Sequence, residues 1–301
     1  MILLWLILLL AILTLLMIGA YAFYISYRLY HPYSKRRRAA NLEGLDALPL
    51  RLTAAPGIEL DALLLRAGDS RRIVVITHEL GSIKERKLKL ARQLLAAGFN
   101  VLLFDLRNHG ESSRDLSMLP MSEKFTDDIV AALRYVQEKL PKIEEVNLFA
   151  FSFSTFPALY IITRDIRQPD TIILDSGPSV KINDLYGKFL DDLGRFLVPP
   201  ILRPPALRAL LKFLFQFFSH HMLSTSWPPD WSRLRSRVLF VVNEKDAIFS
   251  KSEIVSVAER VPNKEVWICA ESAHLQAQRS DPEGYAQTLL HFLNHKAVTS
   301  A

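Results

Sequence analysis

Residues 146–156 read VNLFAFSFSTF, and this stretch decides how the chain folds. Val146 to Ala150 is a short run of apolar and aromatic residues, which is typical of a strand buried in a parallel sheet. From Thr155 to Thr163 the spacing of the apolar residues is helical instead. We therefore expect a strand that runs into a helix through a tight turn, with Ser152 in that turn.

Strand-like and helical segments alternate on both sides of this turn. The other runs typical of buried parallel strands are residues 73–77, 101–105, 171–174, 238–242 and 266–270. Helical spacing occurs over residues 84–97, 122–139, 252–260 and 281–294. Two earlier runs, residues 48–53 and 58–65, flank Pro56-Gly57 and predict an antiparallel pair. This order predicts an α/β fold with a mostly parallel, doubly wound sheet, whose ligands lie beyond the carboxyl ends of the strands.

The composition argues against several kinds of partner. The net charge is +6, and Arg28 with the run Lys35-Arg36-Arg37-Arg38 supplies five of these charges. A nucleic-acid-binding domain would spread its basic residues over the folded part, so we expect no nucleic-acid partner. No cluster of residues with metal-ligand spacing occurs, so neither a metal nor another cofactor is expected. The single Cys269 excludes an internal disulfide and lies in an apolar run, which predicts a core residue.

The N-terminal segment has the composition of a membrane span. Residues 1–27 carry no charged side chain, and a helix of this length crosses a hydrocarbon core of about 30 Å. A cleaved signal peptide is the alternative. However, no Lys or Arg precedes the apolar run, the run is long for a signal peptide, and the tyrosines at 21, 24 and 27 suit an interfacial belt. We therefore expect an uncleaved, single-pass anchor over residues 1–28.

The basic residues after this span predict its orientation. Positive charge accumulates on the cytoplasmic side of membrane spans, so we expect the folded domain to be cytoplasmic. Residues 29–46 would form a basic linker that also attracts anionic lipid headgroups.

A long interval between the strands at 171–174 and 238–242 interrupts the alternation. Residues 185–197 have one apolar face, prolines follow at positions 199, 200, 204 and 205, and residues 206–218 are apolar nearly all round. A structureless insertion of this length would be unusual. We therefore expect a helical cap over residues 178–235, inserted between the two parts of the core domain, residues 47–177 and 236–301. The alternative is that these apolar residues merely pack on the core.

The turn at Ser152 resembles the nucleophile elbow of the α/β hydrolases, which has the pattern G-x-S-x-G. Ala150 and Ser154 replace the two glycines. Small residues are required two positions either side of the nucleophile, because strand and helix approach each other closely there. Choosing Ser154 as nucleophile would place Phe156 at one of these positions. The spacing therefore favours Ser152, with Ser154 as a nearby hydrogen-bonding residue.

The resemblance also implies which residues act with Ser152. A serine nucleophile needs a base, and the base needs an acid to orient it. In this family the acid and then the histidine follow the serine along the chain, each after a strand. His274 follows the last predicted strand, and Asp246 lies just past the strand at 238–242. Asp175, at the end of the preceding strand, is the alternative acid.

Two loops extend the resemblance over most of residues 48–294. Residues 105–112 resemble the family's D-x-R-x-H-G-x-S loop, which is usually structural, so we assign no proton transfer to His109. Residues 77–82 lie where the family carries its H-G-x-G oxyanion loop. The resemblance implies that the backbone N–H groups of Leu80 and Phe153 would face the developing negative oxygen.

Glu79 departs from this pattern, because a carboxylate replaces a glycine beside the expected oxyanion hole. An inward, ionised Glu79 would oppose the negative charge of the intermediate. Dienelactone-hydrolase-like members of the family also carry His-Glu here. The alternative is an outward Glu79 that pairs with Lys84 or Arg86.

Together these residues imply a membrane-anchored serine hydrolase of the esterase, lipase or thioesterase type. Its substrate would be a carboxylic ester or thioester, and the apolar cap and the span favour a hydrophobic, lipid-like acyl group. An acyltransferase that uses the same serine is a close alternative. A non-catalytic, membrane-tethered binding protein is an alternative of another class, motivated by the missing glycines. The retained serine, acid and histidine favour catalysis.

Overall fold

The computed structural model describes residues 1–32 and 41–295. The basic run Lys35-Arg36-Arg37-Arg38, to which the sequence assigns a role at the membrane surface, lies outside the described residues.

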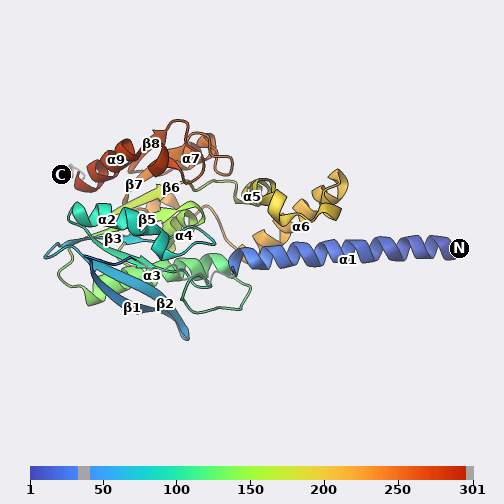
Figure 1. The fold of residues 1–301 in the computed structure, drawn as a ribbon, viewed down its shortest axis with the longest axis horizontal. Helices are drawn as coiled ribbons and strands as arrows, with labels where there is room; N and C mark the ends of the chain where they lie inside the picture. Colours follow the sequence, from blue (N-terminus) through green and yellow to red (C-terminus); the bar gives the residue numbers. More distant parts are fainter. Residues whose placement is uncertain (33–40, 296–301) are drawn as a thin grey trace.

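An eight-stranded sheet forms the centre of the domain, in the order β1-β2-β4-β3-β5-β6-β7-β8 (Figure 1). β1 and β2 form the predicted antiparallel pair, β2 is also antiparallel to β4, and β3 to β8 are parallel. The strands are β1 Asp46–Ala55, β2 Ile58–Arg66, β3 Arg72–Ile76, β4 Asn100–Phe104, β5 Glu145–Phe151, β6 Thr171–Asp175, β7 Arg237–Asn243 and β8 Lys264–Cys269. The predicted α/β fold with a mostly parallel sheet is confirmed.

Helices cover both faces of this sheet, as its apolar strands require. One face carries α2 Leu88–Ala96, α8 Ala277–Ser280 and α9 Pro282–Asn294. The other carries α3 Met121–Lys139, α4 Thr155–Tyr160 and α7 Lys251–Ala258. Short 3₁₀ helices are η1 Lys84–Lys87, η2 Ser152–Ser154, η3 Ile161–Thr163, η4 Pro200–Leu202 and η5 Trp231–Arg233. The helices predicted over 84–97 and 155–163 are therefore each made of a 3₁₀ and an α segment.

The long interval after β6 contains the two expected cap helices, α5 Ile182–Leu197 and α6 Pro205–Leu223. They lie beyond the carboxyl ends of the parallel strands, next to the N-terminal helix α1, Ile2–Tyr30 (Figure 1). The apolar face of α5 includes Leu185, Tyr186 and Leu190, all of which are buried. Part of the cap's apolar surface thus packs on neighbouring elements, as the alternative interpretation of the sequence expected.

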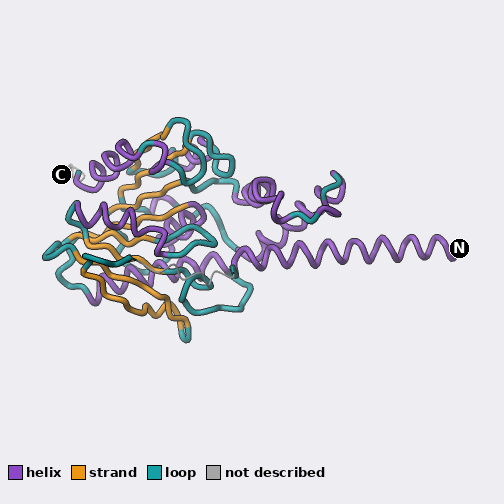
Figure 2. The backbone as a smooth tube through the Cα atoms, viewed as in Figure 1, coloured by secondary structure: helices purple, strands orange, loops and turns teal. Residues whose placement is uncertain are grey.

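Helix α1 has two parts with different surroundings. Residues 1–17 are exposed, and Figure 2 shows this half of the helix extending away from the body of the protein. Ile18, Ala22, Ile25 and Tyr30 are instead buried in the main core cluster. Within the described residues, α1 is the helix long and apolar enough to cross a membrane by length and composition, with a mean hydropathy of 3.0 over its 18-residue window. It continues unbroken to Tyr30, past the predicted boundary at residue 28.

Candidate active site

The predicted turn after β5 has the backbone conformation of a nucleophile elbow. Ser152 has φ +51°, which is unusual for a residue with a side chain and marks a strained position. The hydroxyl of Ser154 accepts a hydrogen bond from the Phe151 N–H and donates one to the Phe151 carbonyl, both at 2.9 Å. Ser154 is fully buried. It therefore closes the turn, while the Ser152 side chain lines a cavity.

Ser152, His274 and Asp246 form one chain of hydrogen bonds. The Ser152 Oγ lies 2.9 Å from His274 Nε2, and His274 Nδ1 lies 2.7 Å from Asp246 Oδ2. Because the Asp246 side chain has no exposed surface and accepts at this distance, Nδ1 carries the proton. Nε2 is then free to accept the serine proton. The structure brings together all three residues that the sequence placed in the triad.

The acid and the base are themselves held in place. The second oxygen of Asp246 accepts the backbone N–H groups of Ile248 and Phe249, each at 2.9 Å. The ring of Phe249 also stacks on His274, with 5.6 Å between ring centroids. These contacts fix the positions of both the carboxylate and the imidazole.

The alternative acid, Asp175, has other partners. Its carboxylate accepts hydrogen bonds from Ser176 Oγ and Tyr285 Oη at 2.8 Å each, and from Asn243 Nδ2 at 3.2 Å. Burial raises its pKa. Ser176 Oγ in turn accepts the N–H of Leu275, next to His274. Asp175 thus supports the loop that carries the histidine, whereas Asp246 contacts the histidine directly.

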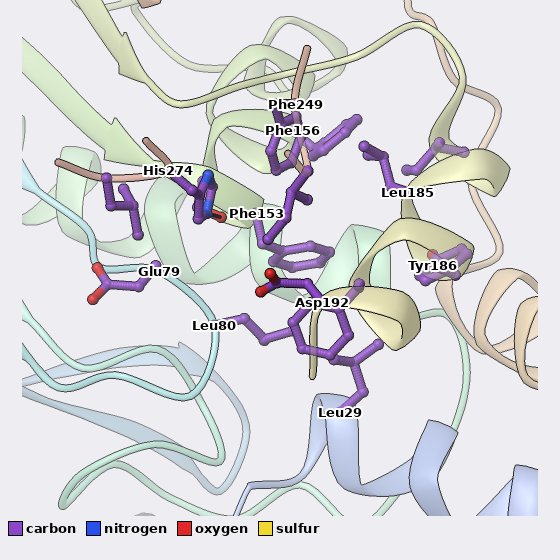
Figure 3. A pocket seen from close by; sticks show the side chains of 15 residues that line it. Leu29, Glu79, Leu80, Phe153, Phe156, Leu185, Tyr186, Asp192, Phe249 and His274 are labelled. Carbon is purple, nitrogen blue, oxygen red and sulfur yellow. Dashed lines mark hydrogen bonds between the residues drawn. The ribbon is translucent and has the colours of Figure 1, made fainter. Parts of the chain in front are cut away.

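The hydroxyl of Ser152 opens into a cavity of about 250 Å³, here called the Ser152 cavity (Figure 3). Its wall is mostly apolar and comes from three parts of the chain. The core supplies Ser152, His274, Glu79, Leu80, Phe153, Phe156, Ile248, Phe249 and Leu275, the cap supplies Ile182, Leu185, Tyr186, Phe189 and Asp192, and α1 supplies Leu29. The residues predicted for the oxyanion hole, Leu80 and Phe153, therefore both lie at the cavity that Ser152 faces.

Glu79 lies at the wall of the cavity and is paired, but with a residue that the sequence-based alternatives did not name. Its carboxylate lies 2.5 Å from the ammonium of Lys87. Burial acts to raise the pKa of Glu79, but the charge of Lys87 and its hydrogen bond outweigh burial and lower the pKa to about 2. The expected partner Lys84 instead pairs with Asp61 and Asp105. Glu79 is thus ionised, with its charge compensated by Lys87.

The loop at residues 105–112 is held by buried hydrogen bonds. His109 Nε2 accepts the N–H of Gly81 at 2.9 Å, and His109 Nδ1 lies 2.8 Å from the Arg107 carbonyl. Burial lowers the pKa of His109 to about 3, so the ring is neutral. The guanidinium of Arg107 donates two hydrogen bonds to one oxygen of Asp128, at 2.7 and 2.9 Å, and the other oxygen accepts the Arg107 backbone N–H at 2.9 Å. His109 therefore holds the loop that contains Leu80.

A doubly wound sheet with a strained serine turn, and with an acid and a histidine after β7 and β8, defines an α/β hydrolase. Residues 68–233 match the family described as "serine aminopeptidase, S33". The chain belongs to this α/β-hydrolase family. Among curated proteins, none matches the sequence significantly.

Solved structures with the same fold include several esterases. An esterase from Pyrococcus furiosus is 18% identical, with a TM-score of 0.68 over 87% of this chain and 97% of its own. An esterase from Exiguobacterium antarcticum is 14% identical, with a TM-score of 0.62 over 82% of this chain and 100% of its own. The enol-lactonase from Burkholderia xenovorans is 15% identical, with a TM-score of 0.57 over 81% of this chain and 100% of its own. At these identities the likeness concerns the fold.

Two residues at the site were not expected from the sequence. Lys87 was not predicted, because the sequence-based alternative paired Glu79 with Lys84 or Arg86. Leu29 was assigned to a linker, and the sequence offers no signal for its place at the site, because the residues before it are apolar on every side of the helix. Within the described residues, no group of three or more His, Cys, Asp and Glu side chains could hold a metal ion.

Proposed function

We propose that this hydrolase is a membrane-anchored serine hydrolase that cleaves a carboxylic ester or thioester with a hydrophobic acyl group. The observation that carries the proposal is the hydrogen-bonded chain from Ser152 through His274 to the buried Asp246, at the wall of an apolar cavity. The membership of the hydrolase family supports the reaction class.

In the proposed first step, His274 Nε2 removes the proton of Ser152 as its oxygen attacks the acyl carbon. Asp246 stabilises the imidazolium that forms. The N–H groups of Leu80 and Phe153 receive the negative oxygen of the tetrahedral intermediate. Two observations support this assignment: both residues line the cavity, and the Gly81 to His109 hydrogen bond fixes the backbone next to Leu80.

Collapse of the intermediate expels the alcohol or thiol, which takes the proton from His274 and leaves an acyl group on Ser152. His274 then takes a proton from water as the water oxygen attacks the acyl carbon, and collapse of this second intermediate releases the acid while the Ser152 oxygen takes the proton back from His274. An acyltransferase would differ only in that another acceptor replaces water in this second half.

The preference for a hydrophobic acyl group rests on the lining of the cavity. Phe153, Phe156, Leu185 and Phe249 are among the apolar side chains around Ser152, and such walls favour apolar ligands over charged ones. The pairing of Glu79 with Lys87 reduces the repulsion that a free carboxylate would exert on the oxyanion.

The proposal also assigns a task to each part of the chain. Residues 1–28 would anchor the protein as an uncleaved, single-pass span, and the basic residues 29–46 would keep the domain on the cytoplasmic side. Residues 47–177 and 236–301 would carry the catalytic groups, and residues 178–235 would cover them. A reporter fused at Ala301 that is active only outside the cytoplasm would reverse this orientation.

A fluorophosphonate probe tests the proposal directly, because it reacts covalently with activated serines. We expect labelling of the wild type and of Ser154→Ala, and none of Ser152→Ala or His274→Ala. Labelling of Ser152→Ala would show that another residue is the nucleophile. A folded wild type that is not labelled would favour the non-catalytic binding protein.

A substrate panel then defines the reaction. Chromogenic esters and thioesters of increasing acyl length are expected to be cleaved with rising kcat/KM. An aminoacyl anilide tests the peptidase activity that the family description suggests. Rapid cleavage of the anilide, with slow cleavage of all esters, would replace the esterase proposal.

A further inference from the structure

The C-terminal half of α1 is bonded into the cap. The hydroxyl of Tyr30 lies 2.8 Å from the hydroxyl of Tyr186 on α5 and donates to the Ser219 carbonyl of α6 at 3.0 Å. Ser219 Oγ also donates to Ser26 Oγ at 3.0 Å. Tyr30, Ser26 and Ser219 have no exposed surface. α1 is therefore a third cap helix with a fixed position, in addition to any role as an anchor.

A second cavity, of about 380 Å³ and here called the α1 cavity, lies along this part of the helix. α1 contributes Tyr21, Tyr24, Ile25, Arg28 and Leu29, and the rest of the wall comes from Pro32, Leu80, Gly81, Phe189 and Phe215. Except for Arg28, its lining side chains are apolar or aromatic. It is thus built to receive an apolar group.

The α1 cavity adjoins the Ser152 cavity. Leu29, Leu80 and Phe189 line both, so these three side chains stand between them. Figure 3 shows Leu29 rising from α1 on the side of the Ser152 cavity opposite Phe249. The Ser152 cavity alone is slightly smaller than ordinary ligand sites, which have volumes of about 300–1,000 Å³, whereas the two cavities together fall well inside that range.

The α1 cavity also lies where the helix would leave a membrane. At about 1.5 Å per residue, residues 2–20 span roughly the 30 Å of a hydrocarbon core, so the lining that starts at Tyr21 begins at the interface. The neighbouring helix α6 exposes Phe213 and Phe217, with 64% and 57% of their surface accessible. Phe217 contacts Phe218, which packs edge-to-face on Phe23 of α1. Apolar side chains of α1 and α6 thus lie together on the side that would face lipid.

We propose that the α1 cavity binds the acyl chain of a long-chain fatty ester that enters from the bilayer beside α1. The ester carbon would lie at Ser152, and the chain would pass between Leu29, Leu80 and Phe189 to lie along Tyr21, Tyr24 and Ile25. The inference rests on the proposed function for the position of the ester. It adds the class of substrate, a membrane ester of a long-chain fatty acid, and the path by which the chain reaches the serine.

A matched pair of variants in the full chain tests the path. Ile25→Trp places a larger side chain in the α1 cavity, and Phe23→Trp places the same side chain on α1 away from both cavities. The measurement is the ratio of kcat/KM for a palmitate ester to that for a butyrate ester, in phosphatidylcholine vesicles. We expect Ile25→Trp to lower this ratio at least about tenfold, since each buried methylene contributes roughly fourfold, and Phe23→Trp to leave it unchanged. An equal ratio in the two variants would overturn the proposal.

A binding experiment separates this inference from the proposed reaction and does not depend on the folding of Ile25→Trp. Full-length Ser152→Ala is reconstituted in vesicles with a photoreactive analogue of palmitic acid, and the adducts are mapped by mass spectrometry. We expect adducts at Ile25, Leu29 and Phe215 that excess palmitate suppresses, with unsuppressed background labelling at Phe23. Equal, non-saturable labelling around α1 would overturn the proposal, even if the wild type cleaves short esters. If the labelling is saturable but the wild type cleaves no ester, the proposed function would be refuted and the acyl-chain site would stand.

Discussion

The carboxylate of Glu79, a residue at the wall of the Ser152 cavity, lies 2.5 Å from the ammonium of Lys87, the last residue of η1. Lys87 also lies over the ring of Phe151, with its Nζ 3.7 Å from the ring centroid. A half-buried anion next to the proposed oxyanion hole is therefore neutralised by Lys87, which is itself held in place. The pair makes the departure from the family's glycine compatible with catalysis.

Removing Lys87 should expose the effect of Glu79 on the reaction. We expect Lys87→Met to lower kcat/KM for esters by about tenfold to a hundredfold at neutral pH, because an unpaired carboxylate opposes the charge of the intermediate. Adding Glu79→Gln should restore most of the rate. Lys89→Met, at an exposed position in the following helix α2, is the control. A double variant as slow as Lys87→Met would contradict the electrostatic explanation.

The same pair predicts how stability depends on pH. The pKa of Glu79 is about 2 in the folded protein, below its ordinary value of 4.5. Because ionised Glu79 is favoured in the folded protein, it stabilises the fold at any pH above its pKa in the unfolded chain. This contribution disappears as the pH falls from about 4.5 to about 2. We expect the difference in unfolding free energy between wild type and Glu79→Gln to be on the order of 2–3 kcal/mol at pH 6 and to shrink through that window. A difference that does not vary with pH would contradict the assignment.

The two candidate acids should behave differently when each loses its charge. Asp246→Asn leaves the geometry intact but favours the wrong histidine tautomer, so we expect kcat to fall by roughly 10⁴-fold with little change in unfolding temperature. Asp175→Asn should affect stability more than rate, because its partners are Tyr285, Ser176 and Asn243. Steady-state kinetics and thermal unfolding of both variants check this. Equal losses of kcat would mean that Asp175 acts in the reaction.

Ser154 should matter for the turn and not for the chemistry. Ser154→Ala removes the hydroxyl that accepts the Phe151 N–H and donates to the Phe151 carbonyl, which leaves two buried backbone groups without that partner. We expect a loss of about 1–3 kcal/mol in unfolding free energy, measured in urea, with fluorophosphonate labelling retained. Loss of labelling in a variant that unfolds like the wild type would make Ser154 part of the catalytic machinery.

Two deletions separate the two parts of α1. Removal of residues 1–17, which are exposed, should leave thermal unfolding of the domain in detergent nearly unchanged. Removal of residues 1–30 deletes Ile18, Ala22, Ile25 and Tyr30 from the core and leaves the Tyr186 hydroxyl without its partner. Each buried apolar side chain contributes about 1.5–3 kcal/mol, so the longer deletion should unfold the cap. Identical unfolding of the two proteins would show that α1 only tethers the domain.

Much of the fold could be predicted from the sequence because the buried strands and helices have distinct periods. The parallel strands are short apolar runs, and each of residues 73–77, 101–105 and 238–242 became a strand within a residue or so of its predicted ends. The cap helices were found from the apolar face of residues 185–197 and the prolines that follow. Local periodicity decides such features, and these elements obey it.

Part of the candidate site could be predicted, because residues that directly follow parallel strands come together at one edge of the sheet. Ser152, Asp246 and His274 follow three parallel strands, and their side chains meet beyond the ends of those strands. The contacts of Glu79 with Lys87 and of Leu29 with the cavity depend on how loops and helices pack in three dimensions. The buried face of α1 could not be predicted either, because in an apolar span the residues that face lipid and those that face protein are of the same kind.

Helix α1 is continuous from Ile2 to Tyr30, so the end that lines the Ser152 cavity is rigidly joined to the end that would lie in lipid. A hydrophobic segment that does not match the thickness of its bilayer adjusts by tilting. Tilting α1 would move Leu29 and Ile25 against Phe189 and change the width of the passage to Ser152. For the proposed membrane-anchored enzyme, turnover of long-chain esters should therefore vary with the acyl length of the surrounding phospholipids, and bilayer thickness would control its rate.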